Sequence, residues 1–156
     1  TLFNMSMRWS TPGMDIELVE FGEGRLRAYH DMLMALPEQE LKWLGSEDID
    51  LEQLQVVQKL YEDPEGPCYC RLAATGNGYI VGDVNLFFNQ EEDAAEINIL
   101  VLPKYRGAGL AQRLLDAGTW EARRRGVKTI IAKIDADNGK AIAFFSKHTF
   151  QPHLVE

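Results

Sequence analysis

Alternating and helical spacings of apolar residues predict strands and helices in the first half of the chain. Acidic and apolar residues alternate over 15–21, which is typical of a half-buried strand. Apolar residues then recur every three or four positions over 25–36 and again over 51–61, so a helix is expected in each segment. Pro37 is expected to close the first helix, and Asp50 is a suitable N-cap for the second.

The second half reads as a run of strands followed by alternating helices and strands. Short polar loops join the first three strands, as in antiparallel hairpins, and Gly126 and Asn138 suit the end of one helix and the start of the next. The expected elements are strands 68–73, 79–88, 95–102, 128–135 and 150–155 and helices 109–125 and 138–147. The pattern predicts an α/β fold with a mostly antiparallel, twisted mixed sheet flanked by about four helices.

Length and composition indicate one domain over residues 1–156, with residues 1–14 as a flexible lead. The chain is 46% hydrophobic and 26% charged, which is ordinary for a folded soluble protein. It has no apolar run of about 20 residues and no long apolar block at its start, so no membrane is expected and a cytoplasmic location is predicted.

The net charge and the two cysteines indicate which partners and metals to expect. A net charge of −8 argues against a nucleic-acid partner and favours a cationic one. Cys68 and Cys70 have no second pair with which to build a tetrahedral metal site. They are expected to be buried thiols, and no metal is expected.

The segment Arg106-Gly107-Ala108-Gly109-Leu110-Ala111 lies between a predicted strand and a predicted helix. The first turn of a helix has unpaired N–H groups and a partial positive charge, so it attracts anions. Glycines at 107 and 109 remove side chains that would keep a phosphate away from those groups. The segment therefore predicts an anion site at residues 107–111.

Two other phosphate motifs do not fit this segment. A nucleotide-triphosphate loop needs GxxxxGK[ST], and no Lys-Ser or Lys-Thr follows these glycines. A dinucleotide fingerprint needs a third small residue where Gln112 stands and an acidic residue about twenty positions further on, where residues 123–133 are basic or apolar.

The remaining pattern, R-x-x-G-x-A, resembles the coenzyme A signature Q/R-x-x-G-x-G/A of the general N-acetyltransferase (GNAT) superfamily. The superfamily often continues with a strand and a helix that reads N-x-x-A-I-x-x-Y-x-K-x-G-F. This chain matches it at Asn138, Ala141, Ile142, Lys147 and Phe150. The run 81–87 and the spacing Phe145-x-Lys147-x-x-Phe150 further resemble the N-acetyltransferase 9-like group.

The resemblance implies an enzyme that moves an acetyl group from acetyl-CoA to a primary amine, such as a protein N-terminus or a lysine. It implies that the pantetheine arm lies along 99–102, that amides of 107–111 hold the pyrophosphate, and that the strands ending near Leu102 and Asp135 splay apart between them. The implied coenzyme residues are Ile99, Leu100, Val101, Leu102, Arg106, Gly107, Ala108, Gly109, Leu110, Ala111, Asn138, Phe145 and Lys147.

Two proton transfers follow from the reaction. The amine must lose a proton, for which Glu96 is the candidate base, with Asp83 and Asp135 as alternatives. The tyrosine that usually acts as general acid is replaced by Phe145. Either the thiolate departs unassisted or via water, or another residue supplies the proton, with Tyr105, Ser146 and His148 as candidates. The alternative function is therefore an acetyl-CoA-binding or protein-interaction module with little or no turnover.

The fold that the resemblance implies usually ends in two strands, but only six residues follow Phe150. An unpaired sheet edge invites pairing with another chain. The sequence therefore predicts either a homodimer or a further segment with the final strand after residue 156.

Overall fold

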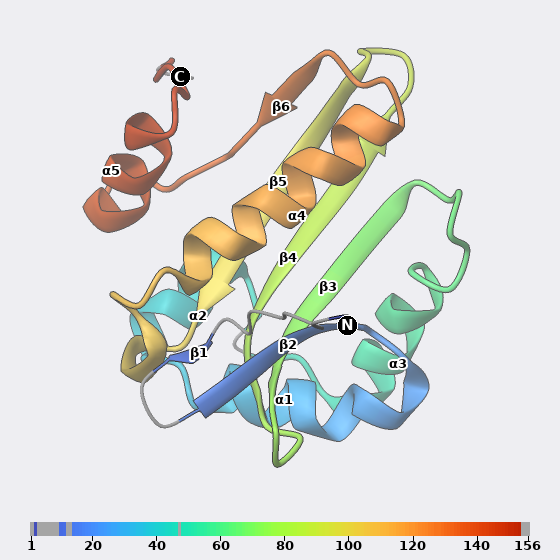
Figure 1. Cartoon of the computed structure of the whole chain (residues 1–156), viewed down its shortest axis with the longest axis vertical. Coiled ribbons are helices and arrows are strands. Elements are labelled where there is room, and N and C mark those ends of the chain that lie inside the picture. Colours follow the sequence, from blue (N-terminus) through green and yellow to red (C-terminus); the bar gives the residue numbers. More distant parts are fainter. Residues whose placement is uncertain (1, 3–9, 12–13, 47, 154–156) are drawn as a thin grey trace.

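One sheet runs through the part of the chain that the structure, a computed structural model, describes: residues 2, 10–11, 14–46 and 48–153. Its strands follow the order β1-β2-β3-β4-β5-β6 (Figure 1). They are β1 (Ser10–Thr11), β2 (Met14–Glu20), β3 (Cys68–Thr75), β4 (Ile80–Asn89), β5 (Ala94–Val101) and β6 (Thr129–Ile131). Neighbouring strands are antiparallel except β5 and β6, which are parallel. The expected mixed, mostly antiparallel sheet is confirmed.

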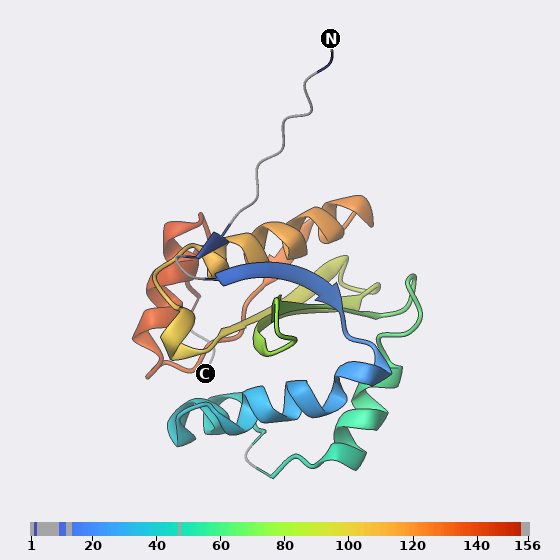
Figure 2. The same ribbon diagram turned by 60° about the horizontal axis from the view of Figure 1, so that its bottom comes forward.

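Helices cover both faces of this sheet. They are α1 (Leu26–Met34), α2 (Glu38–Leu44), α3 (Leu51–Lys59), α4 (Leu110–Arg124) and α5 (Gly139–Lys147), with short 3₁₀ turns at Glu23–Arg25 and Pro103–Tyr105. Figure 2 shows α1, α2 and α3 below the sheet, α4 above it and α5 beside its left end.

Each face buries its own apolar cluster. Leu114 of α4 packs with Val84 and Ile97 on one face, where all three are almost fully buried. On the other face Met32 of α1 and Leu54 of α3 pack with residues of β3, among them Cys70. Both cysteines are free and buried, as expected.

The helix ends lie close to where the sequence places them. The Asp50 carboxylate accepts a hydrogen bond from the Gln53 amide at 2.9 Å, and the Gln53 side chain accepts one from the Asp50 amide at 2.9 Å. The Asn138 side chain accepts from the Ala141 amide at 3.2 Å, so it caps α5. Gly126 follows α4 with a φ of 74°, the left-handed conformation that suits a glycine after a helix.

Four expectations need correction. Helix α2 was not expected, because Pro37 was interpreted as the end of a helix. Pro37 instead occupies the N-cap position of α2, where the fixed φ of proline is tolerated. Ser10 and Thr11 pair with β2 as strand β1, although both fall in the predicted flexible lead, most of which lies outside the described residues.

Strand β6 ends at Ile131 rather than at Asp135, because only its first part has a neighbour to pair with. The predicted strand 150–155 is also wrong for 150–153, which have no regular structure, and its last two residues lie outside the described part.

Candidate active site

The last two strands of the sheet, β5 and β6, pair for three residues and then part. Strand β5 pairs with β6 at Ala94, Ala95 and Glu96, the last opposite Ile131. Beyond this point the chain leaves β5 and runs to α5 (Figure 1). The β5 backbone from 97 to 101 therefore has no β6 partner on that edge, which is the splay that the sequence analysis expected.

The glycine-rich loop lies at the far end of this open edge. Gly107 and Gly109 both have a φ of 84°, in the left-handed region that favours glycine. A Cβ on Gly107 would meet no other atom within 4 Å, and both glycines are exposed. The loop is therefore not packed beneath other side chains, and an anion has room to approach its backbone.

Its amides are available to such an anion. The first backbone hydrogen bond of α4 runs from the Arg113 amide to the Gly109 carbonyl at 3.1 Å, so the amides of 110–112 have no intrahelical acceptor. Those of 107–109 donate to no other residue in the described part of the chain. Six successive N–H groups at the positive end of a 15-residue helix form an anion site.

A cavity of about 310 Å³ joins this loop to α5. Its lining residues are Val101, Arg106, Gly107, Gly109, Leu110, Ala111, Gln112, Phe144, Lys147 and His148. Most of the expected coenzyme loop and Lys147 thus meet at one place. Lys147 of α5 thus adds a cation to a cavity that the N-terminus of α4 also borders, and this combination fits a diphosphate.

Other expected coenzyme residues do not line this cavity: Ile99, Leu100, Leu102, Ala108, Asn138 and Phe145. Phe145 is buried in the core, with its ring centroid 5.0 Å from that of Phe150. Gln112 and Phe144 line the cavity but were missed, and His148, which was considered only as a proton donor, lines it as well. The α5 pair could have been found, since 144, 147 and 148 share one helical face by their spacing.

Arg106 lines the cavity, while its guanidinium group is held by contacts with the rest of the protein. Its Nε donates to the Val101 carbonyl at 2.8 Å, and its guanidinium pairs with Glu40 Oε1 of α2 at 2.8 Å. These contacts fix the start of the loop to the end of β5 and to α2. Glu40 could not be found from sequence, because α2 was not expected.

Among the candidate bases, Glu96 lies where the strands part. Its side chain is 34% exposed, and Oε2 lies 3.5 Å from the Lys133 ammonium, which follows β6 across the splay. By alternation Glu96 shares its sheet face with Asn98 and Leu100. A partly exposed carboxylate at this point can reach both solvent and a group held between the strands.

Asp83 has a different setting. It lies on β4 opposite Leu100, is 2% exposed, and accepts a hydrogen bond from the Tyr29 hydroxyl at 2.5 Å. Desolvation raises the pKa of Asp83 to about 6, although hydrogen bonds from Tyr29 and Asn85 oppose the shift. Its neighbour Leu100 is four residues from Glu96, or roughly 13 Å along the strand, so the two carboxylates cannot serve one reaction centre.

Asp135 is exposed and forms a turn before α5. Its Oδ1 accepts from the Asp137 amide at 2.9 Å, and its carbonyl accepts from the Asn138 amide at 2.9 Å. Both contacts stabilise the turn that precedes α5. The carboxylate of Asp135 therefore has a structural role.

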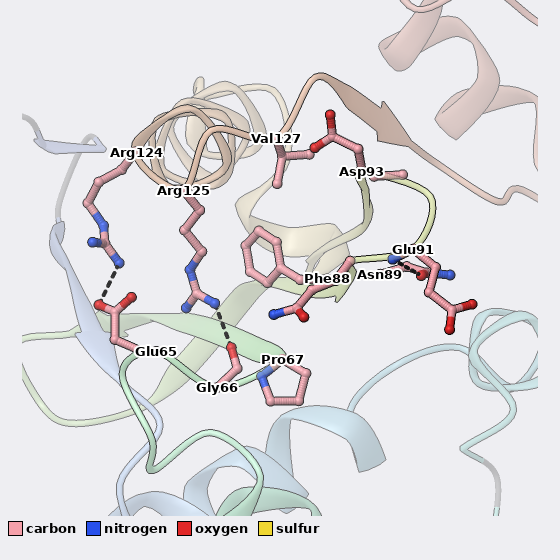
Figure 3. A pocket seen from close by; sticks show the side chains of 12 residues that line it. Glu65, Gly66, Pro67, Phe88, Asn89, Glu91, Asp93, Arg124, Arg125 and Val127 are labelled. Atoms are coloured by element: carbon pink, nitrogen blue, oxygen red, sulfur yellow. Dashed lines mark hydrogen bonds and ion pairs between the residues drawn. The ribbon is translucent and has the colours of Figure 1, made fainter.

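A larger cavity lies toward the other end of the sheet. It measures about 910 Å³ and lies beside the β4–β5 hairpin (Figure 3). Arg125 donates to the Gly66 carbonyl at 2.5 Å and stacks 4.1 Å from the Phe88 ring centroid, while Arg124 pairs with Glu65 at 3.2 Å. Both arginines hold the segment before β3, and none of the residues that line this cavity belongs to the glycine-rich loop or to the open part of β5.

The described residues contain no group of three or more His, Cys, Asp or Glu placed to hold a metal ion. In the same part of the chain, no helix has the length and apolar character that crossing a membrane requires.

Residues 29–150 match the Acetyltransferase (GNAT) family, so the chain belongs to that family. It is a GNAT-type N-acetyltransferase, and its cosubstrate is acetyl-CoA. The open amides at 107–111 and the unpaired edge of β5 fit this cosubstrate.

A curated relative is the N-acetyltransferase 9-like protein of Nematostella vectensis, which is 32% identical over 151 residues covering 88% of this chain and 75% of the relative. The resemblance to that group is therefore confirmed.

Two solved structures show the same fold. The PaiA N-acetyltransferase of Thermoplasma acidophilum, in complex with coenzyme A, has a TM-score of 0.77 at 14% identity and covers 92% of this chain and 94% of its own. The spermidine N-acetyltransferase of Vibrio cholerae, in complex with CoA and spermine, has a TM-score of 0.72 at 19% identity, covering 90% and 85%.

Proposed function

We propose that this enzyme acetylates a primary amine of a protein or peptide, an N-terminus or a lysine, with Glu96 as the general base. One observation supports the proposal above the others: a continuous open backbone edge leads from the anion site at 107–111 to the carboxylate of Glu96.

The dimensions of this edge suit the cosubstrate. Five residues from 97 to 101 span about 16 Å, which an extended pantetheine arm with two amide groups can follow by pairing with the strand. With the pyrophosphate on the loop amides, the thioester comes to lie near Ile97 and Asn98. The cosubstrate supplies an activated acyl group, and the chain supplies position and a base.

The face that carries Glu96 supports a peptide-sized acceptor. Asn85 lies opposite Asn98, and Phe87 lies opposite Glu96, so two amides, an aromatic ring and a carboxylate share one face. Phe87 is 40% exposed, although it is a large apolar side chain. An extended segment can place its apolar side chain on Phe87 and its ammonium at Glu96.

The departing thiolate has no fixed proton donor at position 145, because Phe145 is a buried ring. A thiol has a pKa near 8.5, so a thiolate is a moderate leaving group that can depart and take a proton from water. This leaves the base as the group on which the rate depends. A cytoplasmic location and a homodimer remain predictions from the sequence.

Substitution Glu96→Gln tests the base. Removal of the proton acceptor should lower kcat by about 100-fold while the Kd for acetyl-CoA stays unchanged, because the carboxylate is remote from the loop. Rates on a panel of peptides with free N-termini or lysines, together with calorimetric titration of acetyl-CoA, measure both effects.

The matched control is Glu92→Gln, which neutralises an exposed acid in the β4–β5 hairpin and should leave both values unchanged. A kcat of Glu96→Gln equal to that of the unmodified chain at every pH would exclude Glu96. Tight binding of acetyl-CoA with no transfer to any amine would favour the binding module instead.

A further inference from the structure

Lys133 is an amine of the enzyme itself that lies beside the candidate base. It stands two residues beyond Ile131, where β6 ends opposite Glu96, and its ammonium reaches across the splay to 3.5 Å from Glu96 Oε2. The contact joins the two strands at the place where the thioester is expected.

The position of Lys133 along the splay follows from the strand pairing. Since Glu96 and Ile131 are partners, residue 133 lies level with Asn98. The edge of β5 from 97 onward faces the pantetheine arm in the proposed function. The ε-amine is therefore next to both the proton acceptor and the acyl donor.

The side chain of Lys133 is free enough to react. It is 74% exposed, and its contact with Glu96 is a long, partly exposed ion pair. Exposed ion pairs of this kind contribute little to stability, so the ammonium can leave and return easily. By contrast, Lys128 pairs with Asp93 at 4.0 Å beside the hairpin end of the sheet, remote from the splay.

We infer that Lys133 is a site of self-acetylation, an inference that rests on the proposed function. The Lys133 ammonium gives one proton to the Glu96 carboxylate, directly or through a water. The neutral nitrogen then attacks the thioester carbonyl of acetyl-CoA, forming the C–N bond as the C–S bond breaks. The second proton from nitrogen accompanies the thiolate, and the products are N-acetyl-lysine, coenzyme A and one proton released from Glu96 to solvent.

Self-acetylation changes the site electrostatically. The neutral amide that forms can no longer pair as a cation with Glu96. The carboxylate is then left to the ammonium of an incoming acceptor, so the modification prepares the enzyme for its external substrate.

The test uses the full chain incubated with acetyl-CoA alone, followed by intact mass and peptide mapping at several protein concentrations. We expect one acetyl group on Lys133, at a rate independent of protein concentration and on the order of tenfold or more faster than at Lys128, because the amine is already held at the site. Lys133→Arg should abolish the label, Lys128→Arg should keep it, and Glu96→Gln should slow it at least about tenfold.

Two results overturn the inference in distinguishable ways. If the chain shows a thermal shift with acetyl-CoA and acetylates external amines, yet labels Lys133 no faster than Lys128, then the self-acetylation is wrong and the proposed function stands. If it shows neither a thermal shift nor any transfer, the proposed function fails and the inference fails with it.

Discussion

Asp83 is a buried carboxylate that is held by hydrogen bonds, since no cation in the described part of the chain pairs with it. Burial raises its pKa to about 6, above the value near 3.9 of an unfolded chain. The folded state therefore binds the proton more tightly. The stabilisation is complete below about pH 4 and is lost as the pH rises through 6, a change of roughly 3 kcal/mol.

The substitution Asp83→Asn should remove this pH dependence. The Asn amide oxygen can still accept from Tyr29, but no charge is buried, so the free energy of unfolding at pH 7 should rise by about 1–3 kcal/mol. Urea unfolding between pH 4 and pH 8 measures it. Asp31→Asn, an exposed acid on the same helix as Tyr29, should keep the original slope, and a slope that persists in Asp83→Asn would contradict the assignment.

For single residues, the sequence predicts a role only where the residues that act together are neighbours along the chain. The glycines at 107 and 109 could be assigned because the strand, the turn and the helix are consecutive. The partners Tyr29 for Asp83 and Lys133 for Glu96 come from distant segments, and no spacing rule connects them. The sequence alone therefore leaves the choice among the three candidate bases open.

Strands β4 and β5 approach closely near the coenzyme loop, and Gly82 permits it. A Cβ at this position would lie 2.6 Å from the Leu100 carbonyl oxygen, which is backbone and cannot move alone. Gly82 is the partner of Val101, which lines the cavity. The spacing of the two strands thus sets where the loop begins.

Gly82→Ala should lower the free energy of unfolding by about 1–3 kcal/mol, because the added methyl group forces the two backbones apart. It should also weaken acetyl-CoA binding, since Val101 moves with its strand. Thermal unfolding and calorimetry measure these effects. Gly76→Ala, in a hairpin where a Cβ meets nothing within 4 Å, should be nearly neutral, and equal losses in both variants would refute the argument.

Element prediction succeeded where capping and periodicity agree and failed where tertiary contacts decide. Helices α3, α4 and α5 carry their own end signals, such as Asp50 and Asn138. The isoleucines at 130, 131 and 134 favour a strand over the whole of 128–135, yet pairing ends at Ile131 because β5 and β6 diverge. Divergence of two strands is a property of the sheet, which no single segment encodes.

For the whole molecule, the two ends of the sheet have different roles. At one end the loop, the open edge of β5 and one face of α5 surround a cavity whose amides are free. At the other end, Arg125, which follows α4, donates hydrogen bonds to the carbonyls of Pro64 and Gly66 before β3. The arginines that line the larger cavity there are thus already paired with protein groups. Cavity size alone would favour the hairpin end, whereas the unpaired donors favour the loop end, where we propose that the coenzyme binds.

Amide NMR during a titration with coenzyme A tests the central claim most directly. The account predicts that the backbone amides of 107–111 show the largest shifts, because their N–H groups donate hydrogen bonds to the pyrophosphate, with smaller changes along 97–101. Amides near Phe88 and Arg125 should stay unchanged. Large shifts around Phe88 and Arg125 with none at 107–111 would contradict the account.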